Sequence, residues 1–175
     1  MFSLSQFEHL IDSPQPQLSP RSTRILEMGD FKTVTSVIDS INNRSLIIHG
    51  IVVSHRLMQY FVSRDLSYGP YYVLNNKLVP GDTPNAKVVS VCDSHEKEMR
   101  YFTKDYFDVF ARGKTVKYDG RTISVRQYNF YRWVVQNCVL EALSPVIVQI
   151  NMKKICYGHK PSKKAGSKKR SKESL

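Results

Sequence analysis

The side chains with the clearest chemical potential are the lysines and arginines at the carboxyl end of the chain. From Lys153 onward, nine Lys or Arg residues stand against one acid, Glu173, which gives this segment a net charge of +8. The other 152 residues carry 17 basic and 14 acidic side chains, a net charge of only +3. A dense cationic segment of this kind attracts polyanions such as nucleic acid or an acidic membrane surface.

This basic tail has the composition of a segment that does not fold alone. Residues 160–172, KPSKKAGSKKRSK, contain no large apolar side chain, so we expect them to be disordered. Without a fixed geometry, the tail should contact phosphates of DNA or RNA rather than base edges. The predicted phosphate ligands in the tail are Lys163, Lys164, Lys168, Lys169, Arg170 and Lys172.

Part of the same tail fits a nuclear import signal. The run Lys169-Arg170-Ser171-Lys172 matches the basic four-residue pattern that import receptors read. We therefore expect a nuclear import receptor as a partner and the nucleus as the compartment, with the cytoplasm or a virion as alternatives. Membrane partners are disfavoured, because no Phe, Trp or Leu stands next to the lysines before Leu175. A tail that serves only solubility is the simpler alternative.

A second set of cations lies in the folded part of the chain, in KYDGRTISVRQYNFYRW at residues 117–133. The predicted phosphate ligands here are Lys117, Arg126 and Arg132, with Lys114 and Thr122 on the same polar hairpin face. Tyr128 or Trp133 would stack on a base if either ring were exposed. A solvated face with scattered charges is the favoured alternative, because phosphate contacts require clustering in space.

No pattern in the sequence indicates a reaction. The chain lacks G-x-x-x-x-G-K-[ST], G-x-G-x-x-G and H-E-x-x-H motifs. Cys156 and His159 have a C-x-x-H spacing, but no second pair completes the four ligands of a structural zinc. We therefore expect a non-enzymatic protein without a metal or cofactor, while an enzyme with an unfamiliar site stays open as a third class.

These side chains need a folded body to position them, and 175 residues suffice for one domain with flexible ends. Three widely spaced cysteines disfavour a disulfide framework and suit a reducing compartment. The Ser-, Pro- and Gln-rich residues 12–24 predict irregular structure. We divide the chain into a flexible segment (1–28), a globular domain (29–152) and the basic tail (153–175).

The first half of the domain predicts one clear helix and several strands. Asp30 has the position of an N-cap for a helix that places Phe31, Val34 and Ile38 on one face. The apolar run 45–53, SLIIHGIVV, predicts a buried strand with a bulge at Gly50 and His49 in the core. A short helix at 57–61, a hairpin at 71–79 turning at Asn75-Asn76 and a strand at 86–92 are expected next.

The second half predicts two long helices around a hairpin. A capping box at Asp93 and Glu96 starts a helix that reaches Phe110 and ends at Gly113. Asp119-Gly120 predicts a two-residue type I′ turn that sets Val116 opposite Ile123. A helix at 126–143 and a strand in PVIVQI (145–150) complete a single α+β domain with an antiparallel or mixed sheet and three or four helices.

The helix at 126–143 has an apolar arc too wide for a surface helix, so we expect most of its aromatic side chains in the core. Residues 125–143, VRQYNFYRWVVQNCVLEAL, resemble short uncharacterised proteins encoded by large eukaryotic DNA viruses. The resemblance covers this helix alone and implies no known activity and no functional residues.

The sequence thus favours a non-enzymatic, nucleic-acid-associated protein that binds the phosphate backbone mainly through its basic tail. The alternative is a structural or adaptor protein whose domain binds a protein partner or itself, with the tail as a nuclear localisation signal. The salt dependence of binding distinguishes the two hypotheses, because affinity for a polyanion falls steeply as the salt concentration rises.

Overall fold

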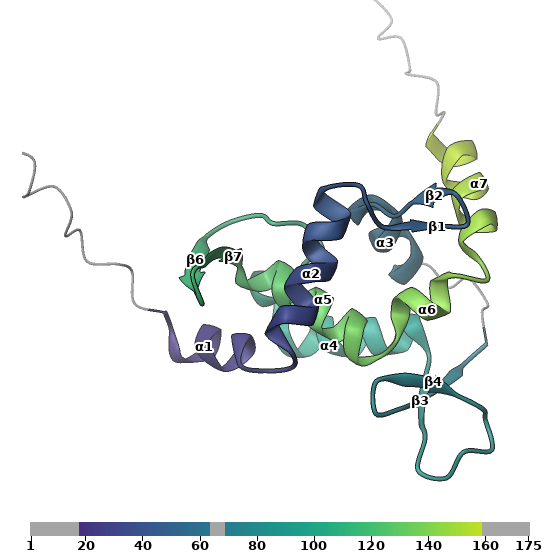
Figure 1. Cartoon of the computed structure of the whole chain (residues 1–175), viewed down its shortest axis with the longest axis horizontal. Coiled ribbons are helices and arrows are strands. Elements are labelled where there is room, and N and C mark those ends of the chain that lie inside the picture. Colours follow the sequence, from purple (N-terminus) through teal and green to yellow (C-terminus); the bar gives the residue numbers. More distant parts are fainter. Residues whose placement is uncertain (1–17, 64–68, 159–175) are drawn as a thin grey trace, which may run out of the picture.

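The computed structural model describes residues 18–63 and 69–158, with helix α5 (Val125–Gln136) at the centre (Figure 1). The large side chains of α5, Tyr128, Phe130, Tyr131 and Trp133, are all buried. Around it pack α1 (Pro20–Leu26), α2 (Phe31–Asn42), α4 (Val91–Tyr106) and α6 (Val139–Leu143). A helix buried on most sides must bond its polar groups internally, which α5 does through several side chains described below.

All strand pairings within the described ranges are antiparallel, and the strands are short. The three small sheets are the pair β1 (Ile47–Ile48) and β2 (Ile51–Val52), the triplet of β3 (Tyr71–Leu74) between β4 (Lys77–Val79) and β5 (Lys87–Val89), and the hairpin of β6 (Thr115–Tyr118) and β7 (Arg121–Ser124). Helices α3 (His55–Val62) and α7 (Ile147–Gly158) pack together beside β2. The predicted single α+β domain is confirmed, although the described chain holds seven helices rather than three or four.

Three local predictions are confirmed by the backbone. The Asp30 carboxylate accepts hydrogen bonds from backbone N–H groups in the first turn of α2. The β3–β4 hairpin turns at Asn75-Asn76, whose φ angles are 50° and 59°. The Asp119-Gly120 turn, with φ angles of 46° and 72°, sets Val116 opposite Ile123 as the type I′ geometry requires.

The N-terminal boundary of the domain lies earlier than predicted. Residues 20–24 belong to α1 instead of an irregular segment, and Ile25 and Leu26 are buried in the core. The Ser19 hydroxyl accepts a hydrogen bond from the Ser22 N–H, and Pro20 stands at the first helical position. Both residues favour a helix start, so the end of the Ser-, Pro- and Gln-rich segment that predicted irregular structure in fact begins α1.

The apolar run at 45–53 forms two strands instead of the predicted one. The chain reverses at His49 and Gly50, whose φ angles are 49° and 76°, and Ile47 is 57% exposed. His49 is exposed, with its Nε2 atom 3.1 Å from the Ser144 hydroxyl oxygen, and so does not lie in the core as expected. The prediction was wrong because an apolar run alone does not exclude a reversal at glycine.

The helix predicted from Asp93 to Phe110 begins earlier and ends sooner. It starts at Val91 with Ser90 at the N-cap position and no side-chain capping bond, so the predicted capping box is absent. Thr103, with φ 60° and ψ 172°, interrupts its last turn. Phe110 and Gly113 consequently lie beyond the helix.

The helix predicted at 126–143 is also interrupted. Cys138 adopts a left-handed conformation with φ 51° and separates α5 from α6. The Asn137 carbonyl accepts a hydrogen bond from the Tyr71 hydroxyl over 2.7 Å, and Lys87 Nζ donates to the Asn137 side chain. These long-range bonds stabilise the break, and no local pattern encodes them. The predicted strand at 145–150 is wrong: residues 145 and 146 form a turn and α7 begins at Ile147, with Ile147 and Ile150 buried one turn apart in the core.

Candidate nucleic-acid interface

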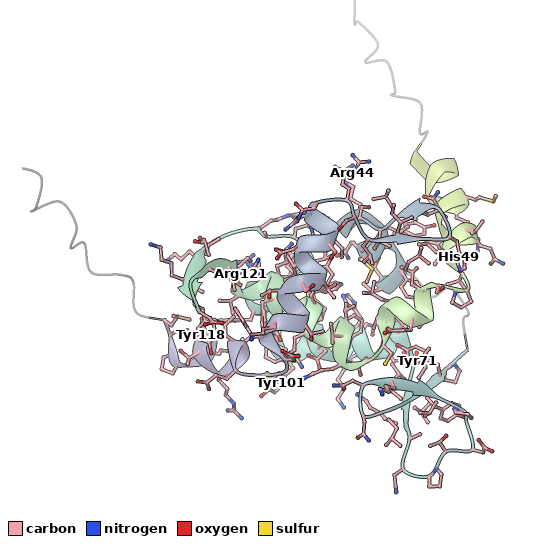
Figure 2. All side chains as sticks on the ribbon, viewed as in Figure 1. Arg44, His49, Tyr71, Tyr101, Tyr118 and Arg121 are labelled. Carbon is pink, nitrogen blue, oxygen red and sulfur yellow. The ribbon has the colours of Figure 1, made fainter. Side chains whose placement is uncertain are left out.

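The polar face of the β6–β7 hairpin is accessible to a large ligand. Lys117 in β6 is paired with Thr122 in β7, and both are exposed; Lys114 is also exposed and precedes β6. Arg121 has a different role, because its Nη2 atom donates to both carboxylate oxygens of Asp39 over 2.7 and 2.6 Å. This ion pair holds the hairpin against α2 (Figure 2). The face therefore offers Lys117 to a phosphate backbone, while Lys114 lies outside the paired strand and not on the predicted polar face.

The two predicted arginines of α5 are engaged within the protein. The Arg132 side chain is 5% exposed, and its Nη2 atom donates to the Glu98 carboxylate over 2.8 Å. Arg126 is 22% exposed, with its Nη2 atom 4.0 Å from a carboxylate oxygen of Asp105. Arg132 therefore lies in the interior and not on the predicted surface, while Arg126 is only partly accessible.

Neither aromatic side chain proposed for stacking is exposed. The Tyr128 hydroxyl donates to the Met28 carbonyl oxygen over 3.1 Å, and burial raises the pKa of Tyr128 to about 12. The indole N–H of Trp133 donates to the Ser94 hydroxyl over 2.9 Å. Both rings are buried, so they anchor α5 to its neighbours and offer no face to a base.

The predicted cations are thus not gathered into one patch on the body. The tail cations Lys163, Lys164, Lys168, Lys169, Arg170 and Lys172 lie outside the described residues, and their phosphate contacts stay a prediction. Within residues 18–63 and 69–158, no helix combines the length and apolar character that crossing a bilayer requires.

A cationic surface that no sequence motif marks surrounds Tyr101 on α4. Tyr101 is 69% exposed and lies at the edge of the molecule (Figure 2). Two hollows of about 370 and 600 Å³ share Tyr101, Phe102 and Met28 in their walls. The exposed cations of these walls are Arg21 and Arg24 from α1 and Lys97 and Arg100 from α4. We call this surface, with the three shared wall residues, the Tyr101 groove.

Sequence spacing indicates only the α4 side of this groove. Lys97 and Tyr101 are four residues apart, so a helix places them on one face. The contribution of α1 comes from 80 residues away, where Arg21 Nη2 donates to the Tyr101 carbonyl oxygen over 3.3 Å. The guanidinium of Arg21 also lies 4.5 Å from the centre of the Tyr106 ring. Only the packing of α1 against the core brings these groups together.

A separate pocket of about 290 Å³ contains the most strongly perturbed histidine. His95 lines it together with Lys104, Asp108 and Arg112. The imidazole is surrounded by aromatic rings and has no hydrogen-bond partner among the described residues. Burial lowers the pKa of His95 to about 4, so the ring is neutral near pH 7. A neutral, enclosed imidazole contributes no charge to phosphate binding.

A second histidine, His55, is bonded at both ring nitrogens. Its Nδ1 atom lies 2.6 Å from the Tyr131 hydroxyl, and its Nε2 atom lies 2.9 Å from the Asn42 side-chain oxygen. Burial lowers the pKa of His55 and raises the pKa of Tyr131. His55 thus has a structural role in joining α2, α3 and α5.

Across the described part of the chain, no three His, Cys, Asp or Glu side chains are grouped as metal ligands.

The comparison with known families matches residues 24–175, a range that includes α2 to α7 and the whole basic tail. No curated protein and no solved structure matches the chain. The matching family is described as a family of unknown function. On the extent of this match, the chain belongs to the DUF7197 family.

Proposed function

We propose that this chain is a non-enzymatic, nucleic-acid-associated protein that binds the phosphate backbone mainly through residues 160–175. The observation that supports the proposal is the charge distribution, because eight of the eleven net positive charges follow Met152. Several arginines of the folded body are already paired with carboxylates, including Arg132 with Glu98 and Arg121 with Asp39. The tail therefore supplies the largest share of charge for a polyanion.

Contacts made by such a tail are independent of nucleic-acid sequence. Lysines separated by Ser, Gly and Ala follow the backbone charge and present no rigid group to a base edge. The tail also directs the protein to the nucleus in this proposal, with Lys169-Arg170-Ser171-Lys172 as the import signal. A viral origin, suggested by residues 125–143, is compatible with a nuclear or virion location.

A gel-shift comparison tests the proposal with three proteins. They are the intact chain, a chain lacking residues 160–175, and a full-length chain with Lys163, Lys164, Lys168, Lys169, Arg170 and Lys172 changed to Gln. Both altered proteins should lose most affinity for duplex DNA and RNA, while a fourth protein added for comparison, Lys114→Gln with Lys117→Gln, should lose less. Unchanged binding by the two tail variants would show that the folded body, and not the tail, holds nucleic acid.

The adaptor alternative is favoured by a different observation. Val148 and Met152 lie one turn apart on α7, and they are 43% and 62% exposed. Paired apolar side chains on one helix face suit a protein partner or a second copy of the chain. If this alternative holds, Val148→Asp with Met152→Asp should abolish a protein complex seen by crosslinking, whereas the tail variants should leave that complex intact.

A further inference from the structure

Tyr101 combines high exposure with a fixed ring position. Its ring centre lies 4.7 Å from that of Phe102, and the ring planes meet at 84°. Phe102 is 6% exposed, so the ring that Tyr101 contacts belongs to the core. The Tyr101 carbonyl accepts a hydrogen bond from Arg21, which further ties this turn of α4 to α1. An aromatic ring is therefore presented to solvent from a rigid support.

The charge around this ring is strongly positive. The walls of the Tyr101 groove contain Arg21, Arg24, Lys97 and Arg100, all exposed. Arg132 and Glu98 also line it, but they neutralise each other through their ion pair. Glu96 pairs with Arg100 at 3.0 Å, and both side chains are mostly exposed, so water and salt weaken that pair. The groove thus keeps a net positive charge close to its aromatic ring.

The two hollows have a size that suits nucleotides. Their volumes of about 370 and 600 Å³ exceed what a single ring needs. Cations from α1 line the first hollow, and cations from α4 line the second, so a bound strand would meet charge on both helices. Proteins that bind single strands combine such a cationic groove with aromatic rings on which unpaired bases stack.

We propose that the Tyr101 groove binds single-stranded nucleic acid, with a base stacked on Tyr101 and phosphates beside Arg24 and Lys97. This inference rests on the proposed function, and it adds a preference for single strands that the tail alone cannot give. The tail contacts phosphates of any strand, whereas the groove requires a base free to leave its stack. Bases of an intact duplex are already stacked and paired, so the groove should contribute little to duplex binding.

The test measures the fluorescence anisotropy of a labelled single-stranded oligonucleotide and of a duplex of the same length. The protein is the full-length chain, both intact and with its six tail cations changed to Gln. Tyr101→Ala should weaken single-strand binding by roughly tenfold in the tail-neutralised protein, since one stacked base contributes about that much. Tyr101→Phe keeps the ring and should bind as well as the parent, and duplex binding should not respond to either change.

Charge variants provide a second, independent readout. Arg24→Gln with Lys97→Gln should weaken single-strand binding and reduce its dependence on salt. The matched control is Lys32→Gln with Lys77→Gln, which removes two exposed cations from α2 and β4 and should have a smaller effect. Melting temperatures of the two charge variants should match the parent, because the four altered side chains are exposed.

The outcomes separate the groove from the tail. If the intact protein binds both probes and Tyr101→Ala binds the single strand as tightly as the parent, the groove proposal is overturned and the tail proposal stands. If single-strand binding depends on Tyr101 while neutralising the tail changes nothing, the groove stands and the tail proposal is overturned. Binding to neither probe overturns both. If Tyr101→Ala weakens binding of a poly-glutamate peptide and leaves oligonucleotide binding unchanged, the groove binds an acidic protein partner instead.

Discussion

The guanidinium of Arg132 and the carboxylate of Glu98 form an ion pair of 2.8 Å between α5 and α4. Arg132 also donates to Asn129 Oδ1 over 2.8 Å and to Gln136 Oε1 over 2.6 Å. Its side chain is 5% exposed, so these three acceptors replace the water that the guanidinium loses. Arg132 is thus a structural cation at the centre of the fold, although it stands in a sequence rich in aromatic and basic residues.

Removing this arginine should destabilise the fold. Arg132→Ala leaves Glu98 without its cation and the side-chain oxygens of Asn129 and Gln136 without this donor, which should lower the free energy of unfolding by about 3 kcal/mol. Urea denaturation followed by circular dichroism measures the change. Arg100→Ala is the matched control, because its exposed pair with Glu96 should contribute less than about 1 kcal/mol. Equal effects of the two changes would contradict the structural role of Arg132.

The enclosed His95 should make stability depend on pH. Its folded pKa of about 4 lies below the usual value of 6.5, so the unfolded chain binds this proton first as pH falls. Above pH 6.5 the neutral imidazole makes its full contribution to the free energy of unfolding. This contribution is lost progressively as pH falls to 4, and the total loss is up to roughly 3 kcal/mol. The unfolding free energy of the parent should therefore fall more steeply between pH 7 and 4.5 than that of His95→Gln. Parallel pH profiles of the two proteins would show that protonation of His95 does not cause the pH dependence of stability.

Strain at Thr103 should be relieved by glycine. With φ 60° and ψ 172°, Thr103 occupies a region that is almost restricted to glycine, and its side chain is exposed. Thr103→Gly should raise the free energy of unfolding by about 1 kcal/mol, while Thr103→Ala, which keeps a Cβ atom, should gain much less. Thermal denaturation of the three proteins compares them directly. A loss of stability in Thr103→Gly would indicate that this backbone position is not strained.

The tail should suffice for nuclear import. Residues 153–175 fused to a large reporter should move it into the nucleus, because they include the predicted signal at 169–172. Changing Lys168, Lys169 and Arg170 to Ala should return the reporter to the cytoplasm, as fluorescence microscopy would show. The matched control changes Lys153, Lys154 and Lys160 to Ala and should leave localisation unchanged. A fusion that stays cytoplasmic would exclude this import role.

Local sequence signals predicted the elements whose geometry is decided within a few residues. Asp30 caps α2 and Asp119-Gly120 turns the hairpin because each acts on its own neighbours. The break at Cys138 was not predictable in the same way, because bonds from Tyr71 and Lys87 to Asn137 support it. Elements that depend on distant partners require the tertiary structure.

The same distinction explains the candidate sites. The core role of most α5 aromatics followed from their wide apolar arc, and burial of Tyr128 and Trp133 agrees with it. The burial of Arg132 did not follow, since a charged residue is usually exposed unless a partner such as Glu98 meets it from another helix. The Tyr101 groove needs α1 beside α4, and sequence spacing alone carries no sign of that contact.

The most direct test of tail-mediated binding is the salt dependence of affinity for duplex DNA. Residues 160–175 contain seven Lys or Arg side chains: Lys160, Lys163, Lys164, Lys168, Lys169, Arg170 and Lys172. Each phosphate contact adds about 0.9 to the slope of log Kd against log salt, so full engagement predicts that deleting these residues reduces the slope by roughly six. The melting temperature should not change with the deletion. An unchanged slope, with affinity retained, would contradict binding through the tail.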